Sequence, residues 1–156
     1  MNTKHISLMG LLIATVLATE YALIGLPNIQ LTFLFFIVAA SIFDEIKLLT
    51  MIMIYVTIDM LLGGFVPQLY LGWFMAWLVM IFDFKYLSAI LAPLVYTVTI
   101  GFASIVMYNL NVVAYFTADL PYTIALISST LLTVIWLYDP LHKTIGGQYE
   151  QMARYD

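Results

Sequence analysis

The sequence predicts an all-α membrane protein, a compact bundle of six transmembrane helices that forms a single integral membrane domain over residues 1–156. Of its residues, 64% are hydrophobic and only 9% are charged, whereas a soluble domain is about 45–50% apolar and about 25% charged. The apolar residues stand in continuous runs and do not alternate with polar ones, which favours helices over a β-barrel. We therefore expect a multi-pass protein of a prokaryotic plasma membrane, with the lipid bilayer as its solvent.

Each apolar run predicts one membrane span, because a spanning helix needs roughly 20 residues. The six expected spans are residues 6–26, 31–43, 46–62, 68–82, 86–108 and 120–138. In chain order they end at Pro27-Asn28, Asp44-Glu45, Gly63-Gly64, Asp83, Asn109 and Asp139-Pro140. The second and fourth spans are short, so we expect them to borrow loop residues or to be shielded by neighbouring helices. Pro93 lies inside the fifth span and predicts a kink, since membrane helices tolerate proline.

All five basic residues fall on one side of these six spans. Lys4 precedes the first span, and Lys47 and Lys85 lie in the turns before the third and fifth spans. Lys143 and Arg154 follow the sixth. The positive-inside rule makes this side cytoplasmic, with both termini inside. The outer side then consists of residues 27–30, 63–67 and 109–121.

Two acidic residues lie within the expected spans, in the outer third of the bilayer. Glu20 is about 10 Å, and Asp59 about 6 Å, below the outer ends of the first and third spans at 1.5 Å per residue. Acids inside a membrane protein are costly and usually functional. One interpretation is an outward-facing pocket for a small molecule. The other is that each carboxyl forms a hydrogen bond with a neighbouring Thr, Tyr or amide.

The pocket interpretation adds polar and aromatic residues from the outer ends of the other spans. Besides Glu20 and Asp59, the expected substrate-binding residues are Asn28, Gln30, Gln68, Trp73, Asn109, Asn111 and Tyr122. The expected outer side carries acids and amides but no Lys or Arg, so a neutral or cationic ligand is favoured over an anionic one.

A second pattern lies on the first span, where Gly10, Ala14, Ala18 and Ala22 are spaced by four and share one helix face. Small residues at this spacing let another helix approach closely, so this face is expected to contact a partner.

Enzymatic, nucleotide-binding, metal-binding and nucleic-acid-binding functions have no support in the residues. The sequence contains no phosphate-binding loop, no Ser-His-Asp arrangement, no metal-ligand cluster and no basic patch for nucleic acid. We therefore expect neither enzymatic activity nor a cofactor or metal.

The chain resembles the substrate-binding S component of an energy-coupling factor (ECF) vitamin transporter over nearly its whole length. The residues that carry the resemblance are Ala14–Ala18, the segment 26–32, Gly63-Gly64 with Gln68 and Gly72-Trp73, and the ending Leu137–Leu141. The resemblance implies that Ala14 and Ala18 dock on a transmembrane coupling subunit, which assembles with two ATPase subunits. It also implies that a vitamin or related micronutrient binds near the outer surface and is imported. Riboflavin, thiamine or its pyrimidine, pyridoxamine, cobalamin and queuosine precursors all remain open as ligands.

Two alternatives belong to other functional classes. Cell-shape proteins of the MreD type are small membrane scaffolds with five or six spans, and they share the small-residue face but need no acidic pocket. A free-standing carrier could instead use Glu20 or Asp59 with a proton gradient. The absence of a repeated half in the sequence disfavours that carrier.

Overall fold

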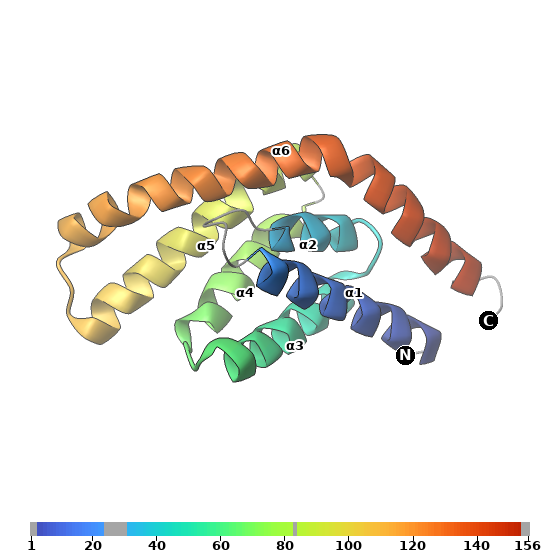
Figure 1. The fold of residues 1–156 in the computed structure, drawn as a ribbon, viewed down its shortest axis with the longest axis horizontal. Helices are drawn as coiled ribbons and strands as arrows, with labels where there is room; N and C mark the ends of the chain where they lie inside the picture. The colour runs from blue at the N-terminus through green and yellow to red at the C-terminus, as the bar shows by residue number, and fades with distance from the viewer. Residues whose placement is uncertain (1–2, 24–30, 83, 154–156) are drawn as a thin grey trace.

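All regular secondary structure is helical in the computed structural model, which describes residues 3–23, 31–82 and 84–153. The helices are α1 (Thr3–Ala22), α2 (Thr32–Ala40), α3 (Glu45–Gly63), α4 (Gln68–Met80), α5 (Lys85–Tyr108) and α6 (Val112–Ala153) (Figure 1). The prediction of an all-α protein is confirmed. Four of the helices, α1, α3, α5 and α6, are long and apolar enough to cross a membrane.

Helix α2 forms the centre of the hydrophobic core. All of its residues from Thr32 to Ala39 are buried, and it contacts each of the other five helices. A helix that is apolar on every side is stable when it is covered on every side. Its nine residues make a helix of about 14 Å, less than half the thickness of a bilayer core of about 30 Å. The neighbouring helices therefore shield this short segment, as the sequence led us to expect.

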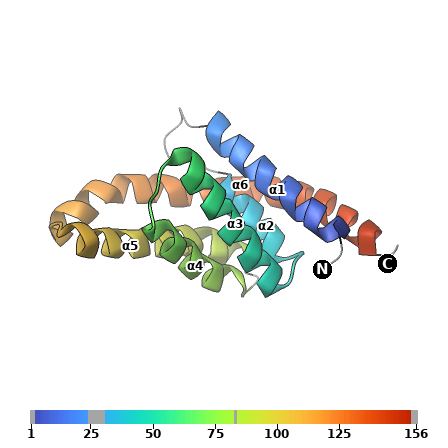
Figure 2. The same cartoon turned by 90° about the horizontal axis from the view of Figure 1, so that it is seen from below.

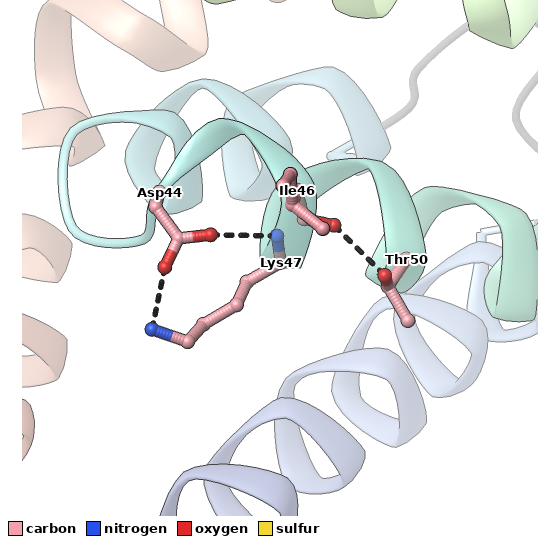
Figure 3. A network of polar contacts seen from close by, with 4 residues as sticks. All are labelled: Asp44, Ile46, Lys47 and Thr50. Carbon is pink, nitrogen blue, oxygen red and sulfur yellow. Dashed lines mark hydrogen bonds and ion pairs between the residues drawn. The ribbon is translucent and has the colours of Figure 1, made fainter. Parts of the chain in front are cut away.

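A side-chain cap closes the turn between α2 and α3 (Figure 3). Asp44 precedes α3 in an extended conformation, and its Oδ1 accepts a hydrogen bond from the backbone N–H of Lys47 at 2.9 Å. The Lys47 ammonium also forms an ion pair with Asp44 Oδ2 at 2.5 Å. The hydroxyl of Thr50 donates to the carbonyl of Ile46 at 2.8 Å. The side-chain contact with Lys47 is the main cause that lowers the pKa of Asp44 below its ordinary value, followed by the bond from the Lys47 N–H.

Helix α6 is much longer than the expected sixth span. It has 42 residues, about 63 Å at 1.5 Å per residue, and it contains both Pro121 and Pro140. The expected loop over residues 109–121 is wrong, because α6 already begins at Val112. The sequence predicts that the sixth helix ends at Asp139-Pro140, but a long helix in a packed bundle can lose one backbone hydrogen bond at a proline and bend instead. Figure 1 shows α6 bending in its C-terminal part.

The start of α1 and the end of α6 lie at the same end of the molecule (Figures 1 and 2). Tyr149 of α6 joins these segments, since its ring stacks on His5 at a centroid distance of 4.8 Å and meets Phe43 edge-on at 5.2 Å. An ion pair of 2.9 Å between Lys85 Nζ and Asp139 Oδ1 links the start of α5 to α6. These contacts hold the C-terminal part of α6 against the rest of the protein.

Candidate functional site

Glu20 and Asp59 belong to a group of four polar side chains that joins α1 to α3. The hydroxyl of Tyr55 on α3 donates to Oε2 of Glu20 on α1 at 2.5 Å. In a reciprocal arrangement, the hydroxyl of Tyr21 on α1 lies beside the carboxyl of Asp59 on α3. Tyr55 and Asp59 are four residues apart and so share one face of α3. We call Glu20, Tyr21, Tyr55 and Asp59 the carboxyl–tyrosine cluster.

The two carboxyls of this cluster lie close enough for their charges to interact. Each carboxyl belongs to a residue that is neither fully buried nor fully exposed. Gly63, at the end of α3, adjoins the same group, because a Cβ placed on it would lie 3.6 Å from the Tyr21 hydroxyl and 4.0 Å from Asp59 Oδ1. The interpretation that a neighbouring tyrosine satisfies the acid thus has direct geometric support at Glu20.

An aromatic core continues the cluster toward α2, α4 and α5. Trp73 of α4 is 3% exposed and lies 5.5 Å from Tyr55, 5.0 Å from Tyr96, 4.8 Å from Phe33 and 5.2 Å from Phe36 between ring centroids. The structure therefore brings three of the predicted site residues together, because Trp73 packs on the tyrosine that bonds Glu20, and Asp59 lies one turn further along α3.

Gln68 lies in a separate contact between α4 and α5. Its side chain is buried, and Nε2 donates to the Ser104 hydroxyl at 3.5 Å. Within the described part of the chain, Oε1 of this amide has no hydrogen-bond partner. One turn along α4, a Cβ on Gly72 would lie only 2.6 Å from Ile100 Cγ1 and 3.0 Å from the Tyr96 ring. The glycine thus permits the close helix approach that sets Gln68 against Ser104.

Asn109 and Asn111 have local structural roles in the turn between α5 and α6. Asn109 adopts the left-handed conformation (φ 51°) that ends α5, and its N–H donates to the Ile105 carbonyl. Asn111 caps α6, because its Oδ1 accepts a hydrogen bond from the N–H of Ala114 at 3.0 Å. Both views show this turn at the end of the molecule away from α1 (Figures 1 and 2). The structure does not bring these amides to the carboxyl–tyrosine cluster.

The remaining predicted binding residues are not part of the cluster as described. Tyr122 lies on α6 and is exposed. Asn28 and Gln30 lie outside the described residues. Tyr55, Tyr96 and Ser104 were missed by the sequence interpretation. Tyr55 had one usable signal, its spacing of four residues from Asp59, whereas nothing local in the sequence marks Tyr96 or Ser104.

The small residues of α1 form an uncovered stripe on the molecular surface. Gly10, Ala14, Ala18 and Ala22 are all exposed, and a Cβ placed on Gly10 would meet no atom within 4 Å. The residues that are offset by two positions from these small residues face inward. Leu8, Leu12 and Val16 are buried, and Glu20 continues the same row with a spacing of four. Helix α1 therefore has an inner face that ends in the carboxyl–tyrosine cluster and an outer face of small side chains.

The described residues contain no group of three or more His, Cys, Asp or Glu side chains placed to hold a metal ion. Comparison of the chain with models of protein families, with curated proteins and with solved structures finds no match. The functional argument therefore rests on the residues and their geometry.

Proposed function

We propose that this chain is the solute-binding membrane subunit of an ECF-type importer for a vitamin or related micronutrient. The observation that carries the proposal is the division of α1 into two faces. Its inner face places Glu20 in a cluster of acids and tyrosines inside an otherwise apolar protein. Its outer face leaves Gly10, Ala14, Ala18 and Ala22 open for close contact with another helix.

The composition of the cluster favours a neutral or cationic ligand with hydrogen-bond donors. An ionised carboxylate can accept about four hydrogen bonds, and Tyr55 provides one to Glu20. The remaining acceptor positions of Glu20 and Asp59 suit an amine or an aminopyrimidine. Trp73 and Tyr96 offer aromatic surface beside them.

We further propose that the chain crosses the membrane six times with both termini in the cytoplasm. The common position of the start of α1 and the end of α6 supports an even number of crossings (Figure 1). Because α2 is buried by its neighbours, it need not match the thickness of the bilayer. The basic residues would then face the cytoplasm, where a coupling subunit with two ATPase subunits would use the open face of α1.

A membrane scaffold of the MreD cell-shape type is a second candidate, and one observation favours it. Glu20 already has a hydrogen-bonded tyrosine partner on the facing helix, and Tyr21 lies beside Asp59. The cluster can therefore act as a polar contact that holds α1 against α3. A scaffold would need such a contact for stability without binding any solute. The open stripe on α1 suits either function.

A ligand titration separates these two functions. The purified chain would be titrated with thiamine, its aminopyrimidine, pyridoxamine and riboflavin while tryptophan fluorescence is followed, since Trp73 touches Tyr55 in the cluster. We expect one compound to give a saturable response that Trp73→Phe abolishes and that Trp136→Phe, at an exposed position, retains.

Charge-removing variants then test the acids themselves. Glu20→Gln or Asp59→Asn should weaken binding by about tenfold or more, as for a hydrogen bond to a charged group. Glu45→Gln, at an exposed acid at the start of α3, is the matched control and should bind normally. Unchanged affinity in both cluster variants would refute the acidic site, and a failure of every compound to bind would favour the scaffold.

A further inference from the structure

A small groove lies between α5 and α6, apart from the carboxyl–tyrosine cluster. Its volume is about 120 Å³. It is lined by Leu94, Thr97 and Val98 from α5 and by Phe116, Asp119, Leu120 and Thr123 from α6. Leu120 is exposed, whereas Thr123 is buried, so the groove leads from the surface of the helix pair inward to a polar end.

The polar atoms of the groove are hydrogen-bond acceptors only. The single hydroxyl proton of Thr123 is donated to Asp119 Oδ2 at 2.9 Å. The hydroxyl proton of Thr97 is directed at the carbonyls of Pro93 and Leu94, each 3.0 Å away. A hydroxyl has one proton to donate and two lone pairs that accept. The groove therefore offers a carboxylate and the lone pairs of two hydroxyls, but no free donor.

The charge of Asp119 has no counter-charge among the seven residues that line the groove, because none of them is basic. A carboxylate in apolar surroundings is costly unless a cation pairs with it. The ring of Phe116 adds a surface that attracts cations. The groove is thus complementary to a positively charged hydrogen-bond donor and would repel an anion.

The size and position of the groove limit which cationic groups can bind in it. One water molecule takes about 30 Å³ of liquid, so the groove accommodates roughly four non-hydrogen atoms. Asp119 lies seven residues from the start of α6, about 10 Å along the helix. With the start of α6 at the membrane surface, the groove would lie just below a headgroup layer that is roughly 5–8 Å deep, within about one bond length or two of an aminoethyl group that leans inward.

We propose that the groove between α5 and α6 binds a primary ammonium group on a short alkyl chain. The three N–H donors of that group match the three acceptor groups Asp119, Thr97 and Thr123. Free aminoalkanes and the aminoethyl headgroup of phosphatidylethanolamine share this chemistry. The site is additional to the solute site at the carboxyl–tyrosine cluster and does not rest on it.

The test uses the full chain in nanodiscs of phosphatidylcholine and phosphatidylglycerol, which lack primary amines. Ethylammonium is titrated by calorimetry, and ethanol serves as the uncharged probe of the same size. We expect saturable binding of one ethylammonium per chain and no heat of binding for ethanol at the same concentrations. An absence of saturable ethylammonium binding, or equal binding of ethanol, overturns the proposal.

Variants locate the binding within the groove. Asp119→Asn keeps the shape and removes the charge, so affinity should fall by about tenfold to a hundredfold. Glu150→Gln, at an exposed acid on the same helix, should bind as the unaltered chain does. Leu120→Trp, at an exposed position, covers the groove without changing charge and should also abolish binding. Full affinity in both Asp119→Asn and Leu120→Trp, with thermal unfolding unchanged, contradicts the assignment.

A change of lipid composition distinguishes the two possible sources of the ammonium group, the lipid headgroup and a free amine. If the headgroup is the natural occupant, replacing phosphatidylcholine by phosphatidylethanolamine should lower the apparent affinity for ethylammonium, and should do so only when Asp119 is present. If a free amine is the natural ligand, that replacement should leave the affinity unchanged.

Discussion

At the residue scale, the distinguishing feature of this protein is a small group of polar side chains among apolar ones. Glu20 and Asp59 each meet a tyrosine across the α1–α3 boundary, because an unpaired polar group in an apolar surrounding is costly. The sequence predicted both acids as special from that cost alone. It could not predict their partners, since the pairing of Glu20 with Tyr55 spans 35 positions and depends on how two helices align.

The contribution of one such pair can be measured through Tyr55→Phe, which removes the hydroxyl that donates to Glu20. We expect the free energy of unfolding to fall by about 1.5–3 kcal/mol, as for a hydrogen bond to a charged group. Denaturant unfolding in detergent provides the measurement. Tyr122→Phe, at an exposed tyrosine, is the matched control, and equal stability of the two variants would show that the pair contributes nothing.

The cap of α3 gives a pH-dependent prediction at the same scale. Contacts with Lys47 lower the pKa of Asp44 below its ordinary value of 3.8. A carboxyl with a lowered folded-state pKa stabilises the fold above 3.8, and this contribution is lost as the pH falls through the folded-state value. Asp44→Ala should cost about 0.5–2 kcal/mol at neutral pH. The difference from the unaltered chain should shrink in acid, and a difference that is constant with pH would contradict this role.

At the element scale, each of the six apolar runs in the sequence corresponds to a helix of the structure, because a continuous apolar run is stable as a helix that neighbouring helices or lipid cover. Helix α5, for example, occupies Lys85–Tyr108 against an expected 86–108. The failures come from proline. The sixth helix was expected to end before Pro140, and residues 109–121 were expected to form a loop, yet α6 begins at Val112 and runs through both Pro121 and Pro140. Whether a proline ends or bends a helix depends on packing that local sequence does not reveal.

The distance between a glycine and the neighbouring helix predicts whether that glycine tolerates replacement by alanine. Gly72→Ala places a Cβ 2.6 Å from Ile100 Cγ1, and Ile100 is β-branched and stiff within a helix. We expect a loss of about 1–3 kcal/mol, typical of overpacking, in thermal or denaturant unfolding.

Gly10→Ala is the matched control for this substitution. Its new Cβ meets nothing within 4 Å, so stability should hold or rise by up to about 1 kcal/mol through helix propensity. Equal effects of the two substitutions would show that α4 and α5 do not pack closely at Gly72.

At the scale of the whole molecule, two regions of the protein have distinct proposed tasks. The carboxyl–tyrosine cluster joins α1 to α3 and continues into a buried aromatic core with side chains from α2, α4 and α5. The small-residue stripe of α1 lies on the surface. Because helix periodicity is local, the spacing in the sequence is enough to place the stripe and Glu20 on opposite faces of α1. It could not predict that Asn109 and Asn111 lie far from both, because that depends on where α5 and α6 turn.

The exposed position of the stripe predicts that substitutions there affect assembly with the partner complex but not solute binding. Ala14→Trp or Ala18→Trp should leave folding and solute binding intact, because both positions are exposed. Each should block assembly with the partner complex, measured by co-purification from the native membrane. Val106→Trp, on the exposed face of α5, is the matched control. Normal assembly of both alanine variants would show that the stripe faces lipid alone.

The central claim, that the chain binds a small solute, is tested most directly by mass spectrometry of what the purified protein releases on denaturation. The chain would be isolated from its native membrane in mild detergent and then incubated with a cell extract before the final purification. We predict one vitamin-like molecule per chain, neutral or cationic, that is retained by Glu45→Gln and lost in Glu20→Gln. A folded protein that releases no small molecule after incubation with the extract would contradict the claim and favour the scaffold.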